Sequence, residues 1–136
     1  MKYQLLLIED DPIFTFLLEK GIKHAELKGD IISFSNGKPA IEYLTEGYSE
    51  SNNYIIFLDL NMPVMNGWEF MDQLETFAKT ENCMVFVLTS SAYRNDIERL
   101  KKKPLVADFV TKPITEYILN GIKETIEDRF EKNHPI

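Results

Sequence analysis

The sequence predicts an α/β domain in which a parallel sheet of five strands lies between two layers of helices. Three observations carry this prediction. Five short apolar runs alternate along the chain with five segments whose apolar residues recur every three or four positions. The apolar runs are nearly continuous, which is typical of strands buried on both faces. The length of 136 residues suits one domain, which we place over 1–136, with a core over about 3–127 and a polar tail over 131–136.

The first unit starts with the apolar run Leu5–Ile8, which stops at Glu9, Asp10 and Asp11. Asp11 suits a helix N-cap, and Pro12 suits the first helical position. Apolar residues at spacings of three and four then mark one face of a helix. These residues are Phe14, Leu17, Leu18, Ile22 and Ala25.

The second and third units repeat this order. Ile31–Phe34 is the second predicted strand, and residues 35–37 form a turn. A short helix follows, marked by Ala40, Ile41 and Leu44. The third strand, Ile55–Leu58, ends on Asp59. After a loop, a third helix is marked by Trp68, Phe70, Met71, Leu74 and Phe77.

The last two units complete the pattern. Met84–Leu88 is the fourth predicted strand, and a strongly charged helix with Ile97 and Leu100 follows it. Val106–Val110 is the fifth strand. A ladder of isoleucines then marks the fifth helix, at Ile114, Ile118, Ile122 and Ile126.

Composition excludes several classes of protein. The formal charge of −7, from 22 acidic and 15 basic side chains, argues against direct nucleic-acid binding, which needs a basic surface. No apolar stretch approaches the ~20 residues that span a bilayer, so we expect no membrane insertion. The single cysteine, Cys83, rules out an internal disulfide framework and a cysteine-rich zinc site. The amino terminus does not have the pattern of a signal peptide, and we expect a cytoplasmic protein.

Polar residues with chemical potential follow the predicted strands at one end. Because ligands of open α/β sheets bind at the carboxyl ends of the strands, these residues are the candidates for a site. They are Glu9, Asp10, Asp59, Asn61, Thr89 and Lys112. Clustered carboxylates repel one another, and a hard cation that prefers oxygen ligands relieves the repulsion, so we expect Mg²⁺, or Mn²⁺ in its place. A carboxylate between a metal ion and a lysine is suited to accept a phosphoryl group.

Taken singly, each of these residues has a simpler explanation. Asp10 and Asp11 can cap a helix, Thr89 is an ordinary strand-end residue, and most lysines such as Lys112 are solvated surface residues. The shared position at the same end of four strands favours a site over these separate explanations.

The four segments LLLIEDDP, FLDLNMPVMNGWEF, VFVLTSS and FVTKPI resemble the receiver domain of two-component response regulators. Their order and spacing match over roughly Tyr3 to Glu127. The resemblance is to stand-alone, chemotaxis-type receivers. It implies a flavodoxin-like, doubly wound (βα)5 fold with strand order 2-1-3-4-5.

The resemblance also implies roles at the metal and acceptor positions. Asp59 matches the aspartate that takes the phosphoryl group from a partner's phosphohistidine. Asp10 matches a direct magnesium ligand, and Glu9 matches an acid that binds the metal through water. Asn61 matches the position that offers its backbone carbonyl to the metal. Together with Ser91, Asn61 also lies where the family tunes dephosphorylation.

Further matches concern the switch and the loops. Thr89 matches the switch hydroxyl, Lys112 the lysine that contacts the phosphoryl group, and Phe109 the switch aromatic, which lacks a tyrosine hydroxyl. The family often has a cis peptide bond before the next residue, Pro113. In the loop after the acceptor, Pro63 and Gly67 match, and we expect the glycine to supply backbone freedom.

These matches predict a phosphoacceptor rather than an enzyme, with only self-catalysed phosphorylation and slow autodephosphorylation. A histidine kinase or a histidine phosphotransfer protein would supply the phosphoryl group to Asp59 in a Mg²⁺-dependent transfer. Thr89, Lys112 and Phe109 would then rearrange, and the surface formed by the fourth helix, fifth strand and fifth helix would bind a downstream protein. We expect no output domain.

Three alternatives remain open. The first is a small Mg²⁺-dependent phosphohydrolase with Asp59 as nucleophile, although Asn61 stands where such enzymes need a second acid. The second is a phosphate-blind interaction module that keeps only the fold, which the full set of site residues disfavours. The third is a fragment of a longer regulator, and the lack of a linker after the fifth helix favours a free-standing receiver.

Overall fold

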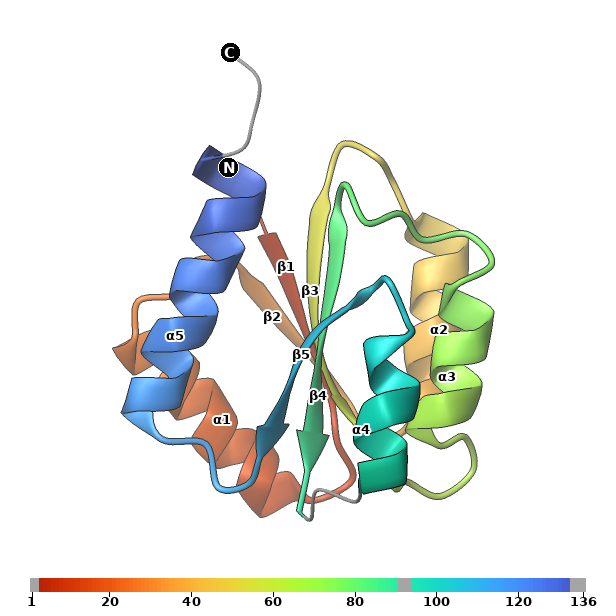
Figure 1. Cartoon of the computed structure of the whole chain (residues 1–136), viewed down its shortest axis with the longest axis horizontal. Coiled ribbons are helices and arrows are strands. Elements are labelled where there is room, and N and C mark those ends of the chain that lie inside the picture. The colour runs from red at the N-terminus through yellow and green to blue at the C-terminus, as the bar shows by residue number, and fades with distance from the viewer. Residues whose placement is uncertain (1–2, 91–93, 133–136) are drawn as a thin grey trace.

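The strands and helices alternate along the chain as predicted (Figure 1). A computed structural model describes residues 3–90 and 94–132. The strands are β1 (Tyr3–Ile8), β2 (Asp30–Phe34), β3 (Asn53–Asp59), β4 (Cys83–Thr89) and β5 (Val106–Thr111). The helices are α1 (Pro12–His24), α2 (Gly37–Gly47), α3 (Gly67–Leu74), α4 (Arg94–Lys101) and α5 (Glu116–Glu127), and a π-helical turn, Asp128–Lys132, extends α5.

All five strands are parallel, in the order β2-β1-β3-β4-β5. This order confirms the one that the resemblance implied. The chain leaves β1 toward one edge of the sheet, at β2, and returns past β1 to form β3. The strand order therefore reverses beside β1 and β3, and their carboxyl ends border the crevice where such folds bind ligands.

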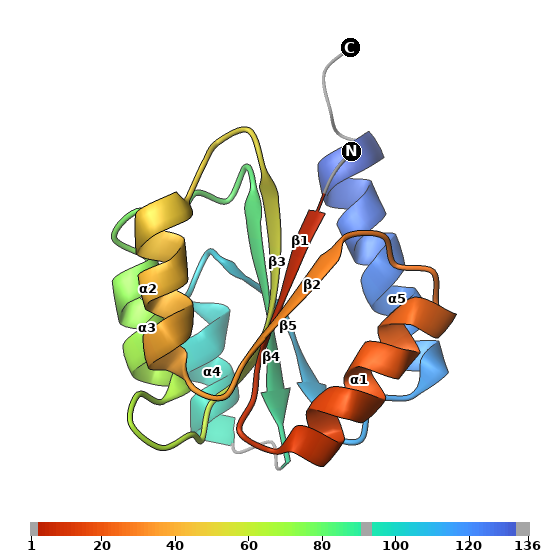
Figure 2. The same ribbon diagram turned by 180° about the vertical axis from the view of Figure 1, so that it is seen from behind.

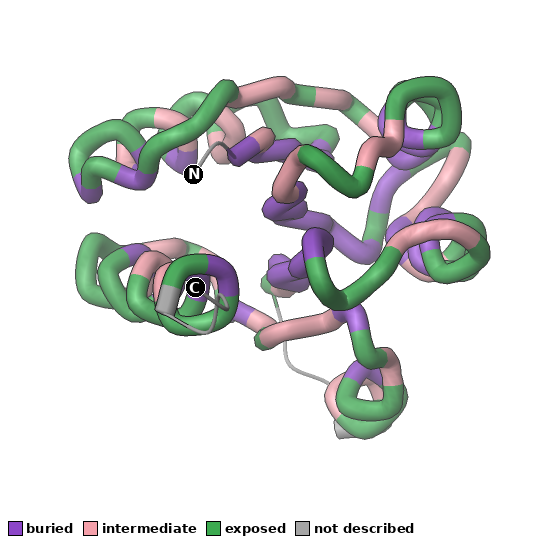
Figure 3. Tube along the Cα trace, turned by 90° about the horizontal axis from the view of Figure 1, so that it is seen from above, coloured by how far each residue is buried: buried purple, intermediate pink, exposed green. Residues whose placement is uncertain are grey.

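The sheet separates two apolar cores. Helices α1 and α5 cover one face, and α2, α3 and α4 cover the other (Figures 1 and 2). Along β1, Leu5 and Leu7 point to the α1–α5 side, whereas Leu6 and Ile8 point to the opposite side. All four are fully buried, and the view along the sheet shows buried residues concentrated on its central strands (Figure 3). Burial on both faces explains why the strands read as continuous apolar runs.

Helix α1 begins as predicted, and its cap lies next to the candidate site. The Asp11 side chain accepts hydrogen bonds from the backbone nitrogens of Ile13, at 3.0 Å, and Phe14, at 3.4 Å. Pro12 occupies the first helical position, where its missing N–H costs nothing. The simpler role that the sequence allowed for Asp11 is therefore the one it has.

Helix α3 ends three residues before the predicted Phe77, at Leu74. The backbone nitrogens of Phe77 and Ala78 both point to the carbonyl oxygen of Leu74, at 3.2 and 2.9 Å, so the chain turns there. Phe77 still packs its ring edge-on to Tyr48, with centroids 5.4 Å apart. Phe77 is therefore apolar because it packs on Tyr48, and not because the helix continues to this position.

The core reaches past the predicted limit of residue 127. Phe130 is buried and its ring centroid lies 6.0 Å from that of Tyr3, at the start of β1. Of the predicted tail, Glu131 and Lys132 belong to the π-helical turn, and 133–136 lie outside the described residues. Within the part of the chain that the structure describes, no helix is both long and apolar enough to cross a membrane.

Candidate functional site

Three acids from two neighbouring strands meet at the carboxyl edge of the sheet. Glu9 and Asp10 directly follow β1, and Asp59 is the last residue of β3, which pairs with β1. Carboxylate oxygens of the three residues lie within 4.8 Å of one another. Glu9 and Asp59 are buried, whereas Asp10 is exposed. The structure thus brings together the acids that the sequence placed at adjacent strand ends.

Backbone groups hold these acids in place. The Glu9 nitrogen donates to the carbonyl oxygen of Phe34 on β2 at 3.0 Å, and the Asp10 nitrogen donates to Glu9 Oε2 at 3.0 Å. The backbone nitrogen of Asn61 donates to Asp59 Oδ1 at 3.2 Å. One oxygen of Asp59 is therefore oriented by the loop that follows it, and the other remains available to neighbouring side chains.

Lys112 supplies the positive charge of the site. Its backbone nitrogen donates to the carbonyl oxygen of Thr89 at 2.7 Å, which ties the end of β5 to the end of β4. Its Nζ donates to Glu9 Oε1 and lies 3.7 Å from Asp59 Oδ2. The peptide bond from Lys112 to Pro113 is cis, as the resemblance led us to expect.

The sequence did not single out Phe14 for the site. The Lys112 Nζ lies 4.4 Å from the centroid of the Phe14 ring, on the first turn of α1. The apolar spacing of α1 accounted for Phe14 as a core residue, and it does pack partly against the α1–α5 core. No local signal marks a contact between residues so far apart in the chain.

The buried carboxylates carry an electrostatic cost. Burial is the main cause that raises the pKa of Glu9, to about 8, and the neighbouring Asp59 raises it further while Lys112 opposes the rise. When both groups are ionised, the carboxylate oxygens of Glu9 and Asp59 repel each other across a short distance. A divalent cation that prefers oxygen would relieve this repulsion, so the residues fit such an ion.

The raised pKa of Glu9 predicts that the stability of the metal-free protein depends on pH. A carboxyl whose pKa is higher in the folded state than in the unfolded state binds an extra proton when folded, so its contribution to stability falls as pH rises. We expect Glu9→Gln to gain free energy of unfolding relative to the unmodified chain as pH rises from about 5 to about 8. Urea unfolding in chelator measures this, and a difference that stays constant with pH would contradict it.

The loop after Asp59 passes very close to Gly67. A Cβ atom at Gly67 would lie 2.6 Å from the Asp59 carbonyl oxygen and 2.8 Å from the Leu60 Cα, and the Gly67 nitrogen donates to the Leu60 carbonyl at 2.9 Å. The expectation of backbone freedom at Gly67 is wrong, because the left-handed residue in this loop is Val64, with φ of 68°. Gly67 is required for space. Asn61 and Pro63 lie exposed in the same loop.

The predicted switch residues lie on the two neighbouring strands. Thr89 is the last residue of β4, half-buried, and is paired in register with Thr111 of β5. Phe109 on β5 is half-buried and packs against the core on the α2–α4 side. Ser91 lies outside the described residues.

Comparisons with known proteins agree on one family. The family model described as the response regulator receiver domain matches residues 5–122. The probable methanogenesis regulatory protein FilR2 of Methanothrix harundinacea is 28% identical over 126 residues, which cover 91% of this chain and 79% of that protein. The structure of a two component response regulator from Cytophaga hutchinsonii is 32% identical with a TM-score of 0.81, covering 93% of this chain and 97% of that one.

Further matches include larger proteins and a more distant receiver domain. The chain spans only 5–39% of the length of six further curated relatives, among them histidine kinases and chemotaxis proteins. The receiver domain of a sensor histidine kinase from Pseudomonas aeruginosa, 18% identical with a TM-score of 0.70 over 91% of this chain and 96% of that one, has a magnesium ion coordinated in its active site cleft.

Proposed function

The chain belongs to the response regulator receiver family, and we propose that Asp59 is its phosphoacceptor. Receiver domains accept phosphoryl groups in two-component systems from histidine kinases and phosphotransfer proteins. The observation that carries the proposal is the surroundings of Asp59: one carboxylate oxygen accepts a hydrogen bond from the backbone nitrogen of Asn61, and the other faces the Lys112 ammonium. Carboxylate oxygens of Glu9 and Asp10 lie within 4.8 Å of the Asp59 carboxylate.

We further propose that this acidic cluster binds Mg²⁺, with Mn²⁺ as a substitute. Asp10 and Asp59 would be direct ligands, Glu9 would act through water, and Asn61 would offer its backbone carbonyl. The support is a donor set made only of oxygens, with carboxylates within 4.8 Å of one another. The magnesium ion of the Pseudomonas receiver domain is consistent with this. When bound, the cation would offset negative charge on the transferring group.

The transfer step assigns a task to each side chain. An oxygen of the Asp59 carboxylate forms a bond to phosphorus, the bond from phosphorus to the imidazole nitrogen breaks, and the imidazole leaves with the electron pair. The Lys112 ammonium pairs with the phosphoryl oxygens, and the Thr89 hydroxyl donates a hydrogen bond to them. Asn61 cannot transfer a proton, so hydrolysis of external phosphomonoesters is disfavoured.

A direct test is to find where the phosphoryl group goes. The chain is incubated with Mg²⁺ and acetyl phosphate, the acyl phosphate is trapped by borohydride reduction, and the modified peptide is sequenced by mass spectrometry. We expect one phosphoryl group, on Asp59. Label on another residue, or none in the presence of Mg²⁺, would reject the assignment. An assay with a phosphomonoester tests the phosphohydrolase alternative, and we expect no turnover.

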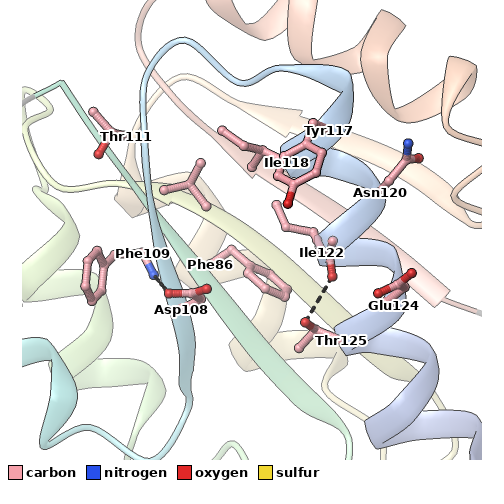
Figure 4. Close-up of a pocket in the computed structure, with 12 residues that line it drawn as sticks. Phe86, Asp108, Phe109, Thr111, Tyr117, Ile118, Asn120, Ile122, Glu124 and Thr125 are labelled. Carbon is pink, nitrogen blue, oxygen red and sulfur yellow. Dashed lines mark hydrogen bonds between the residues drawn. The ribbon is translucent and has the colours of Figure 1, made fainter.

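We propose that phosphorylation changes the face formed by α4, β5 and α5, where a downstream protein would dock. This face carries a groove of about 630 Å³ between β5 and α5, with Tyr117 and Ile118 on one side and Asp108 on the other (Figure 4). Phe109 lies on the opposite side of β5 from α5 in this view. A change in the packing of Phe109 would therefore move the strand that borders the groove.

Beryllofluoride, which mimics an acyl phosphate, should reveal this change. With Mg²⁺ present, we expect large amide shifts at Thr89, Phe109 and along β5 in NMR spectra, because the new oxygens draw the Thr89 hydroxyl and Lys112 toward Asp59. The matched control is Asp59→Asn under the same conditions. Unmoved amides at Thr89 and Phe109 would reject the switch.

The phosphodonor would approach along α1. Three large apolar residues on this helix are strongly exposed: Ile13 at 72%, Phe16 at 55% and Leu17 at 59%. Beside them is a cleft of about 340 Å³ whose lining includes Asp10 and Phe16. An exposed apolar patch that borders the acceptor suits a partner helix that carries the phosphohistidine.

Leu17→Ser should therefore slow transfer from a partner kinase without slowing transfer from a small phosphodonor. Loss of a buried apolar contact at an interface commonly weakens binding about tenfold, and we expect a change of that size in kcat/KM. Tyr117→Ser, which removes an exposed apolar side chain from α5, is the control. Equal slowing with acetyl phosphate would place the defect in the site rather than in docking.

A further inference from the structure

The Phe14 ring is a neighbour of the acceptor site that has no task in the proposed phosphoryl transfer. It lies on the first turn of α1, and the Asp11 cap holds its backbone nitrogen at 3.4 Å. The ring is half-buried, and the Lys112 Nζ lies 4.4 Å from its centroid. The cap that starts α1 thus holds the backbone of the residue whose ring lies beside the Lys112 ammonium.

The ammonium group of Lys112 has three neighbours. It donates to Glu9 Oε1, lies 3.7 Å from Asp59 Oδ2, and lies over the Phe14 ring. Only 20% of the Lys112 side chain is exposed. A lysine side chain has many rotamers, and ordering it for transfer costs conformational entropy unless its surroundings restrict it.

A ring is suited to this task in a way that an aliphatic side chain is not. The π face attracts the cation electrostatically, yet it offers no strong acceptor that would compete with the phosphoryl oxygens for the ammonium hydrogens. A water molecule in the same place would compete. Leucine at this position could still pack against the α1–α5 core, but it would not attract the ammonium group.

We propose that Phe14 is a positioning residue that holds the Lys112 ammonium in reach of the group transferred to Asp59. The inference rests on the proposed function of Asp59. In the step concerned, an Asp59 carboxylate oxygen forms a bond to the phosphorus of acetyl phosphate, the bond from phosphorus to the acetate oxygen breaks, and acetate leaves with the electron pair. Phe14 touches none of these atoms and acts only through Lys112.

A double-mutant cycle tests this on the full chain with Mg²⁺ and acetyl phosphate, so that no protein partner is involved. Phosphorylation is followed by intact mass. Phe14→Leu should slow it about threefold to tenfold, the range expected for a partly buried cation–π contact. Phe14→Tyr keeps the ring and should keep the rate. Phe77→Leu removes a half-buried ring that packs on Tyr48, away from Lys112, and controls for general loss of packing.

The decisive comparison is the effect of Phe14→Leu when Lys112 is replaced by Met. We expect no further slowing in that background. Equal slowing in both backgrounds, or no slowing in the unmodified one, would overturn the proposal. Where the Lys112→Met rate is too low for the cycle, Phe14→Leu and Phe14→Tyr decide, because equal losses would also overturn it. Asp59→Asn tests the acceptor role of Asp59 separately from the role of Phe14. If this variant is still phosphorylated, the acceptor assignment is the hypothesis that fails.

Discussion

Asp59→Asn should abolish phosphorylation by acetyl phosphate and by any partner kinase, while the protein remains folded. The amide lacks the anionic oxygen that forms the bond to phosphorus. Its shape is nearly the same, and its oxygen can still accept from the Asn61 nitrogen. Because one of the three clustered acids is neutralised, we also expect the metal-free variant to be at least as stable as the unmodified chain.

Two measurements check this expectation together. Intact mass after incubation with Mg²⁺ and acetyl phosphate reports the phosphoryl group, and thermal unfolding in chelator reports stability. Glu69→Gln, an exposed acid in the capping box of α3, is a control for loss of a carboxylate outside the cluster and should be phosphorylated normally. A phosphorylated Asp59→Asn chain would show that another residue is the acceptor.

Gly67→Ala should impair both stability and phosphorylation, although residue 67 carries no reactive group. The added methyl would lie 2.6 Å from the carbonyl oxygen of Asp59 and 2.8 Å from the Leu60 Cα, and backbone atoms cannot rotate away as the end of a side chain can. Relief requires the backbone at Asp59 and Leu60 to shift. Overpacking of this kind costs about 1–3 kcal/mol in free energy of unfolding, and displacement of a reacting carboxylate slows transfer further.

Gly121→Ala is the matched control, because a Cβ at Gly121 in α5 would meet nothing within 4 Å. It should be neutral or slightly stabilising, since alanine favours helix more than glycine does. Urea unfolding and the acetyl phosphate rate measure both variants. Normal phosphorylation of Gly67→Ala would mean that the loop adjusts without moving Asp59.

Much of the architecture could be predicted because it depends on residues that are close together in the sequence. Apolar runs such as Leu5–Ile8 exist because both faces of the sheet are covered, and the cap at Asp11 needs only its own and the next few residues. The strand order came from the resemblance, since periodicity within a strand does not report its neighbours. The shared position of the acids could be anticipated because parallel strands end at the same edge.

The features that were missed depend on contacts between distant segments. The Phe14 ring touches Lys112 because α1 and the end of β5 meet in space, and nothing in either segment signals it. The resemblance predicts an unusual backbone conformation at Gly67. Instead, a side chain at Gly67 would collide with the backbone of Asp59, and the residue with a left-handed conformation is Val64. Phe130 likewise packs its ring near that of Tyr3, at the other end of the chain.

The ion pair between Lys112 and Glu9 joins residues 103 positions apart. A chain that is still being synthesised carries Glu9, Asp10 and Asp59 long before Lys112 leaves the ribosome. During that time the three acids lack the Lys112 ammonium and the edge strand β5 that positions it. A nascent or truncated chain that lacks β5 would therefore be a poor phosphoryl acceptor even with its acidic residues in place, and the proposed phosphorylation would begin only once β5 has formed.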